Sequence, residues 1–168
     1  MERHCIYCGQ IAAKQNDNLY TCAAGHENWN NPAPGVAVCI VGKGQILYGI
    51  RSKDPGKGTL DFPGGFMEVG ESAEEAAIRE VKEELGVDVT IERYFGTYPS
   101  HYNGERPVIN IVFLATMTEQ AITPSDDLSG GMPVWRSIDN LPLAEEVMDD
   151  WMIDVQNDLR RQETSLPS

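Results

Sequence analysis

The chain has 168 residues, of which 41% are hydrophobic and 23% charged, a composition typical of a soluble globular protein. The formal net charge of −13 disfavours nucleic acid as a partner, and a small anionic substrate needs a metal ion to approach so acidic a surface. The first ten residues lack the apolar run of a signal peptide and no stretch has the length of a membrane span, so we expect a cytoplasmic protein.

Three of the four cysteines lie near the start of the chain, with a histidine close behind them. The spacing is C-x2-C-x13-C-x3-H, formed by Cys5, Cys8, Cys22 and His26. Zn²⁺ takes four such ligands tetrahedrally, and so short a segment has almost no core without a metal. The pattern predicts a structural zinc ribbon over residues 1–30, closed to substrate. A redox C-x-x-C, a disulfide, and His4 in place of His26 are the alternatives.

A segment rich in Asn and Pro, residues 27–34, connects the ribbon to a second domain at residues 31–162. Apolar and β-branched runs in this domain predict strands at residues 35–41, 45–51, 89–98, 107–118 and 133–137. Cys39 falls inside the first of these strands, where we expect a buried side chain.

The end of the chain predicts one further helix and a tail. Leu143, Val147, Trp151 and Val155 recur at four-residue spacing, so we expect a helix that begins near Leu141. Their stripe is typical of core packing. Residues 163–168 are expected to form a flexible tail.

Between the second and third predicted strands lies a helix that the sequence marks at both ends. Ser72 and Glu75 form a capping box, and Gly86 stands where a left-handed cap ends a helix. Between these limits Glu80, Glu83 and Glu84 share one face, beside an apolar strip of Ala77, Val81 and Leu85. A Glu-rich helix is ordinarily a solvated surface. Like charges this close are destabilising, however, and carboxylate oxygens favour a hard cation, Mg²⁺ or Mn²⁺.

The surroundings of these glutamates decide between the two interpretations. From Gly65 to Val87 the chain reads G-x5-E-x7-R-E-V-x-E-E-x-G-V. This segment resembles the Nudix box, the signature of the Nudix hydrolase superfamily, at every position. The resemblance implies an α/β fold, an α/β/α sandwich around a mixed β-sheet, preceded here by the small zinc ribbon.

The resemblance also implies roles for individual residues. Glu80, Glu83 and Glu84 would ligate Mg²⁺ or Mn²⁺ together with the backbone carbonyl of Gly65, while Arg79 and Glu71 would orient the loop and the helix. The implied reaction is water attack on a nucleoside diphosphate linked to a group X, which releases a nucleoside monophosphate. Glu71, Arg79 and the three glutamates are therefore the candidate catalytic residues.

The substrate contacts follow from position. Pro63, Gly64 and Gly65 are expected to form a turn whose backbone comes close to a phosphate. Arg51 ends a strand just before the active-site loop, where relatives have a phosphate-binding arginine. Tyr98, His101 and Tyr102 are expected either to stack on a base or hydrogen-bond a ribose, or to pack as ordinary strand-end aromatics.

A zinc ribbon ahead of a Nudix box resembles the NADH pyrophosphatase branch and related proteins that act on ADP-ribose-like substrates. The region after the box, residues 96–113, lacks the S-Q-P-W-P-F-P-x-S array of NADH pyrophosphatases, which argues against NADH itself. Asp126, Asp127 and the box glutamates are all candidates for the general base.

The sequence is therefore compatible with two classes of function. The first is a hydrolase that acts on a small ADP-ribose-like or dinucleotide substrate. The second is a nucleotide-sensing module in which the ribbon contacts a partner. The intact box favours the hydrolase, and a homodimer is left open as its assembly.

Overall fold

The computed structural model describes residues 2–102, 106–118, 120–128 and 131–162, so the predicted tail at 163–168 lies outside the described residues. The chain divides into two compact units, Met1–Pro32 and Ala33–Ser168. In the described part of the chain, no helix has the length and apolar character that crossing a membrane requires.

The N-terminal unit is a four-stranded antiparallel sheet. Its strands follow chain order: β1 (Arg3–His4), β2 (Ile11–Lys14), β3 (Leu19–Cys22) and β4 (Glu27–Trp29). A turn follows Cys5 and another follows Cys22. In the first, the N–H of Gly9 donates to Cys5 O, and in the second the N–H of Gly25 donates to Cys22 O. Both glycines have a positive φ, 72° and 80°, which a side chain would strain.

The C-terminal unit contains a seven-stranded mixed sheet in the order β11-β6-β5-β10-β9, with β7 paired to β6 and β8 paired to β5. Its strands are β5 (Ala33–Gly42), β6 (Gln45–Ile50), β7 (Leu60–Asp61), β8 (Gly64–Phe66), β9 (Val89–Tyr102), β10 (Arg106–Met117) and β11 (Val134–Ser137). Only the β5–β10 pair is parallel among the described strands. The five predicted strands are confirmed as β5, β6, β9, β10 and β11.

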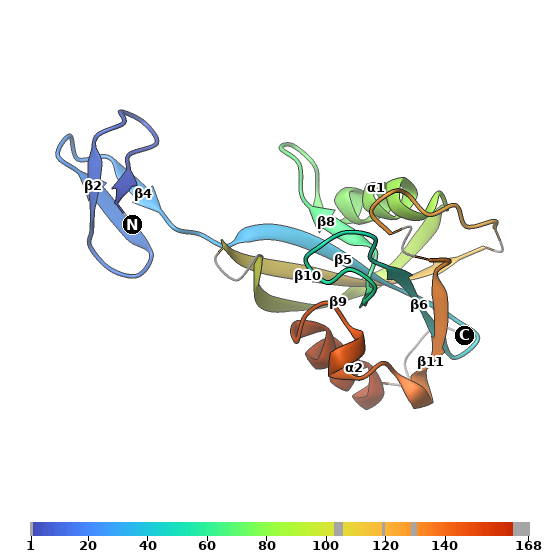
Figure 1. Ribbon diagram of the computed structural model, residues 1–168. Helices are drawn as coiled ribbons and strands as arrows, with labels where there is room; N and C mark the ends of the chain where they lie inside the picture. Colours follow the sequence, from blue (N-terminus) through green and yellow to red (C-terminus); the bar gives the residue numbers. More distant parts are fainter. Residues whose placement is uncertain (1, 103–105, 119, 129–130, 163–168) are drawn as a thin grey trace. The chain divides into compact units, whose positions relative to one another are not determined.

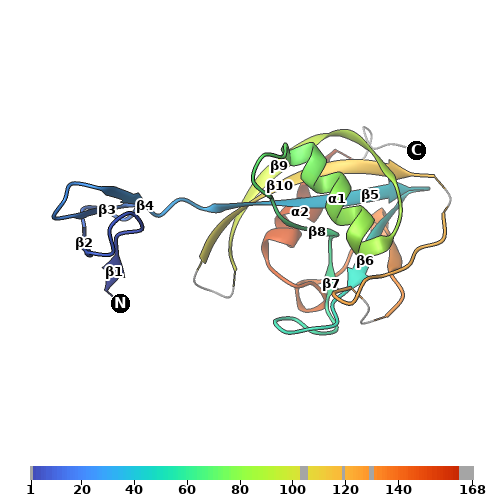
Figure 2. The ribbon, with the colours of Figure 1, turned by 90° about the horizontal axis from the view of Figure 1, so that it is seen from above.

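Two helices cover opposite faces of this sheet, α1 (Ala73–Leu85) and α2 (Trp151–Arg161) (Figure 1). Successive residues of β5 point to opposite faces, so Val38 packs with the buried face of α1 and Cys39 with that of α2. Seen from above, α1 lies across the central strands with α2 behind them (Figure 2). The α/β/α sandwich and the burial of Cys39 are therefore confirmed.

Helix α1 has the ends that the sequence predicts. The Ser72 hydroxyl accepts from the N–H of Glu75, and the Glu75 carboxylate accepts from the N–H of Ser72. Gly86 is left-handed, with φ 72°, and donates to Lys82 O. The face that carries Ala77, Val81 and Leu85 is buried, so the other face is left for the glutamates.

The prediction of a helix from Leu141 is wrong. Residues 138–146 form two short 3-10 helices, η1 (Ile138–Asn140) and η2 (Ala144–Glu146), and α2 begins only at Trp151. The chain between them is extended because Val147 bridges Leu60 and the N–H of Met148 donates to Leu60 O. This pairing brings the start of α2 beside β7.

Candidate active site

The glycines before α1 form strand β8 rather than the predicted turn. Gly64 pairs with Ala37 of β5, and a Cβ at Gly64 would collide with the backbone carbonyl of Val36. A Cβ at Gly65 would lie 2.5 Å from Oε1 of Glu80. Gly64 therefore needs to be glycine because it lies against the backbone of β5, whereas a side chain at Gly65 would displace the carboxylate of Glu80.

The three box glutamates lie in different surroundings. Glu84 is half-buried and accepts a hydrogen bond of 2.8 Å from the N–H of Gly64. Burial raises the pKa of Glu84 to about 8, with nearby carboxylates adding to the shift, and burial also raises the pKa of Glu80. The Glu83 side chain is 60% exposed. Glu80, Glu83 and Glu84 together form an acidic edge, in which burial disfavours the charged form of Glu80 and of Glu84.

Arg79 connects the acidic edge to the preceding loop. Its guanidinium donates to Glu71 at 2.8 and 3.1 Å, to Glu80 at 2.9 Å, to Glu83 at 3.3 Å and to the carbonyl of Phe66 at 3.2 Å. Glu71 also accepts from the N–H of Glu68. These contacts tie loop to helix, the arrangement expected of an orienting pair, and the catalytic role of Arg79 and Glu71 stays a prediction.

The donor set of the acidic edge fits a hard divalent cation. It offers only oxygen ligands, and the carboxylate of Glu80 lies directly over Gly65, whose carbonyl is the predicted fourth ligand. The three carboxylates are not gathered as tightly as the ligand atoms of the cysteine cluster, and Arg79 contacts two of them. Their assignment as metal ligands stays a prediction.

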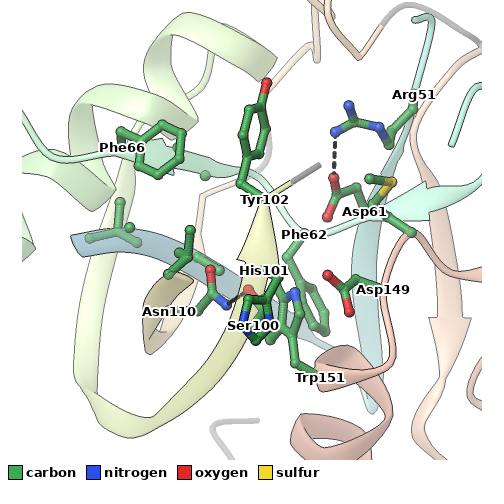
Figure 3. Close-up of a pocket in the computed structure, with 17 residues that line it drawn as sticks. Arg51, Asp61, Phe62, Phe66, Ser100, His101, Tyr102, Asn110, Asp149 and Trp151 are labelled. Atoms are coloured by element: carbon green, nitrogen blue, oxygen red, sulfur yellow. Dashed lines mark hydrogen bonds and ion pairs between the residues drawn. The ribbon is translucent and has the colours of Figure 1, made fainter. Parts of the chain in front are cut away.

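A cleft with a volume of about 170 Å³ opens beside β8. The residues labelled in Figure 3 surround it: Arg51, Asp61, Phe62, Phe66, Ser100, His101, Tyr102, Asn110, Asp149 and Trp151. Gly64 and Gly65 also line it, whereas the three glutamates do not. The two glycines therefore join the cleft to the acidic edge.

Arg51 reaches the cleft from the end of β6, as predicted. Its Nη1 donates to Asp61 Oδ2 at 2.9 Å and its Nε donates to Pro55 O at 2.9 Å. Burial raises the pKa of Asp61 to about 6, although the contact with Arg51 opposes that shift. The described contacts use two of the five guanidinium N–H groups, so others remain for an anion.

Tyr98 lies below the cleft rather than along it. Its hydroxyl donates to Asp158 Oδ2 at 2.9 Å, the side chain is 8% exposed, and burial raises its pKa. Its ring lies 6.4 Å from that of Trp151, which does line the cleft. Tyr98 therefore packs behind Trp151 and does not line the cleft, and its contact with a substrate stays a prediction.

The two candidate bases outside the box come from the loop before β11. The Asp127 carboxylate pairs with Lys53 at 2.6 Å, and the backbone carbonyls of Asp126 and Asp127 both accept from the Ser52 hydroxyl. Asp127 is among the groups that raise the pKa of Glu84. The loop therefore lies close enough to the acidic edge for the negative charge of Asp127 to act on Glu84.

The N-terminal cysteines and His26 form one cluster. Among the described residues these four side chains alone form a group whose ligand atoms all lie within 4.8 Å of one another. Cys8 Sγ lies 3.7 Å from Cys22 Sγ, no disulfide joins them, and His26 rather than His4 completes the set. Burial raises the pKa of Cys5, but hydrogen bonds led by that from the N–H of Tyr7 outweigh it and lower the pKa to about 6. The cluster fits zinc, because thiolates and imidazole are its preferred ligands.

Comparison with known proteins establishes the family to which this chain belongs. A family profile for the NUDIX domain matches residues 31–154. The chain belongs to the Nudix family. It is a Nudix hydrolase, and it is 35% identical over 127 residues to the ADP-ribose pyrophosphatase of Methanocaldococcus jannaschii, covering 73% of this chain and 74% of the relative.

Two further comparisons cover a larger share of this chain. The NAD-capped RNA hydrolase NudC of Pseudomonas aeruginosa is 28% identical over 144 residues, 83% of this chain, and the match covers 49% of NudC, about half its length. The crystal structure of a Nudix hydrolase from Nitrosomonas europaea is 20% identical with a TM-score of 0.75, covering 99% of this chain and 95% of that one. The predicted fold and family of the Nudix hydrolase are thereby confirmed.

Sequence reasoning missed much of the cleft. Asp61, Phe66, Asn110, Asp149 and Trp151 belong to no motif and come from five different elements or loops. Asp61 and Phe66 could have been proposed as site residues from sequence, because they lie close to the Pro-Gly-Gly segment at residues 63–65. The others meet only because the sheet and α2 bring them together.

Proposed function

We propose that the enzyme hydrolyses the diphosphate bond of a nucleoside diphosphate linked to a group X, with Mg²⁺ or Mn²⁺ as cofactor, and releases a nucleoside monophosphate. ADP-ribose-like molecules and dinucleotides are the proposed substrates, and the identity with an ADP-ribose pyrophosphatase supports the first of these. One observation carries the proposal: a complete box places Glu80 and Glu84 against the glycines that border the cleft.

The metal would be held by Glu80, Glu83, Glu84 and the carbonyl of Gly65. When bound, such a cation polarises a phosphoryl oxygen and makes a water acidic enough to attack phosphorus. The chain's own part is positioning. Arg51 supplies guanidinium N–H groups at the cleft, and the bare backbone of Gly64 and Gly65 admits a diphosphate without a side chain in its way.

The proton of the attacking water needs an acceptor. Glu83 and Asp127 are both exposed and both ion-paired, to Arg79 at 3.3 Å and to Lys53 at 2.6 Å, but of the two only Glu83 belongs to the acidic edge. We favour a box glutamate for this reason, with Asp126 and Asp127 as the alternatives. Comparison of the pH–rate profiles of Glu83→Gln and Asp127→Asn proteins would distinguish them, since only loss of the base removes the acidic limb.

The proposed reaction is tested by a product screen. Purified protein with Mg²⁺ is expected to convert at least one of ADP-ribose, NADH, FAD and diadenosine polyphosphates into a monophosphate, and removal of the metal by EDTA should abolish turnover. Nucleoside triphosphates serve as the comparison. Absence of any monophosphate product from every diphosphate derivative would contradict the proposal.

We further propose that Zn²⁺ holds the N-terminal unit together. Among its described residues, that unit has a core of three buried residues, Cys5, Ala12 and Cys22, with Tyr20 packed against them. So small a core stabilises little by itself, and metal binding contributes folding free energy in such units. Three free thiols also suit a reducing compartment, which supports a cytoplasmic location.

Zinc removal is therefore expected to unfold this unit while the catalytic unit stays folded. Trp29 lies in β4, so its fluorescence in a Trp135→Phe, Trp151→Phe protein reports on the N-terminal unit alone. A chelator should release about one zinc per chain and change this signal, whereas a Cys39→Ser protein, altered at the cysteine outside the cluster, should retain its zinc. An unaltered signal after zinc has been removed would show that the metal is not structural.

A further inference from the structure

The floor of the cleft is bare backbone at one point, Gly35 of β5. A Cβ at Gly35 would lie 3.6 Å from Asn110 Oδ1, 3.6 Å from Val108 Cγ1 and 3.4 Å from Gly65 O. Gly35 does not have a positive φ, so backbone conformation does not explain the glycine. It leaves a small patch of the cleft floor without a side chain, so a flat group in the cleft would meet backbone there.

This patch has an aromatic side and a polar side. Gly35 pairs with Phe66 of β8 in one direction and with Asn110 of β10 in the other, so the three residues form a row across three strands. Neighbouring strands lie about 4.8 Å apart, so the row spans roughly 10 Å, which is enough for a nucleobase. Phe66 meets Tyr102 edge to face at 5.4 Å, and Figure 3 shows both rings above Asn110.

The orientation of the Asn110 amide is determined by its neighbours. Its Nδ2 donates to the backbone carbonyl of Tyr98 at 3.1 Å and to Ser100 Oγ at 2.9 Å. A carbonyl only accepts, so a flipped amide would place two oxygens against each other. Oδ1 therefore points to the Gly35 patch, where no donor from the described residues reaches it.

We propose that Asn110 selects the nucleobase of the substrate, by accepting a hydrogen bond from the exocyclic amino group of adenine or cytosine. Hypoxanthine and uracil carry a keto oxygen at the same place, which would face Asn110 Oδ1 with two acceptors opposed. The inference rests on the proposed function for the class of substrate. It adds that the base lies on Gly35, between Asn110 and Phe66.

Binding of the product nucleotides tests this without turnover. In calorimetric titrations of the full chain, the amino member of at least one of the pairs AMP/IMP and CMP/UMP is expected to bind about 10- to 100-fold more tightly. The Asn110→Leu protein should bind the two members of that pair within about 3-fold of each other. The kcat/KM values for ADP-ribose and its hypoxanthine counterpart should show the same loss of preference.

Two further variants keep the outcome interpretable. Ser100→Ala removes one of the two acceptors that hold the amide, so it should reduce the preference only in part, whereas Asn140→Leu changes an exposed asparagine away from the cleft and should leave it intact. Far-ultraviolet circular dichroism confirms that each variant is folded. Equal binding within both pairs by the unmodified protein, or a preference that survives in Asn110→Leu, would overturn the inference. Base preference in binding without hydrolysis of any diphosphate derivative would sustain it and refute the proposed reaction.

Discussion

Replacement of Glu83 by Gln is expected to lower kcat by about 100-fold or more while the fold is retained. A carboxylate ligand gives a divalent cation charge that an amide cannot, and a catalytic cation contributes several kcal/mol of transition-state stabilisation. The substitution would remove Glu83 both as a metal ligand and as the favoured proton acceptor, and the fold should be retained because the side chain is 60% exposed and its one described contact is with Arg79 at 3.3 Å. Steady-state kinetics across a range of Mg²⁺ concentrations would measure the loss.

Glu74→Gln is the matched control for this substitution. Glu74 is exposed on the first turn of the same helix, outside the acidic edge, so its replacement removes the same charge from α1 and should change kcat by less than about 2-fold. Equal kcat values for Glu83→Gln and the unmodified protein would remove Glu83 from the metal site. Unchanged biological activity of a Glu83→Gln protein that no longer turns over substrate would favour the nucleotide-sensing function.

The second large effect is expected from Gly64→Ala, which should lower the free energy of unfolding of the catalytic unit by about 3 kcal/mol. The new Cβ would collide with Val36 O and lie 2.9 Å from Ala37 Cα, and both atoms belong to the central strand β5. Because a backbone in the middle of a sheet cannot move aside, β8 must separate from it. The hydrogen bond from Gly64 to Glu84 would then break, so activity should fall as well.

Thermal unfolding followed by circular dichroism would measure the change, with an expected fall of about 10 °C in Tm. Gly42→Ala is the control, since Gly42 lies on the same strand and its Cβ would meet Trp135 at an ordinary contact distance of 3.5 Å. Its Tm should change by less than about 3 °C. A Gly64→Ala protein as stable as the Gly42→Ala protein would show that β8 is not held against β5 as described.

The fold could be predicted well wherever the signal is local. Helix α1 has a capping box at Ser72 and a glycine cap at Gly86, and both are properties of a few neighbouring residues. The apolar runs predict strands β5, β6, β9, β10 and β11 for the same reason. The start of α2 was missed because the apolar spacing of Leu143 and Val147 is helical, yet contact with Leu60 holds that segment extended.

The site residues that could be predicted are likewise those that lie close together in the sequence. The box glutamates, Arg79 and the cysteine cluster were recognised because each set is close in sequence, and the structure brings the four members of the cluster together as predicted. The sequence predicts a turn in place of strand β8, because a three-residue strand rich in glycine shows no periodicity. Its pairing with β5 is what presses Gly65 against Glu80.

The sequence by itself determined the family, the two helix ends of α1, the acidic edge and the composition of the zinc cluster, because these depend on spacing along one segment of chain. Tertiary structure decided most of the cleft, in which the sequence predicts substrate contacts without an alternative only for Arg51, Gly64 and Gly65. Asp61, Asn110 and Trp151 lie far apart in the chain and meet through strand pairing and the packing of α2. The direction of the Asn110 amide likewise follows from the Tyr98 carbonyl that the β9–β10 register places beside it, and no feature near Asn110 in sequence specifies that neighbour.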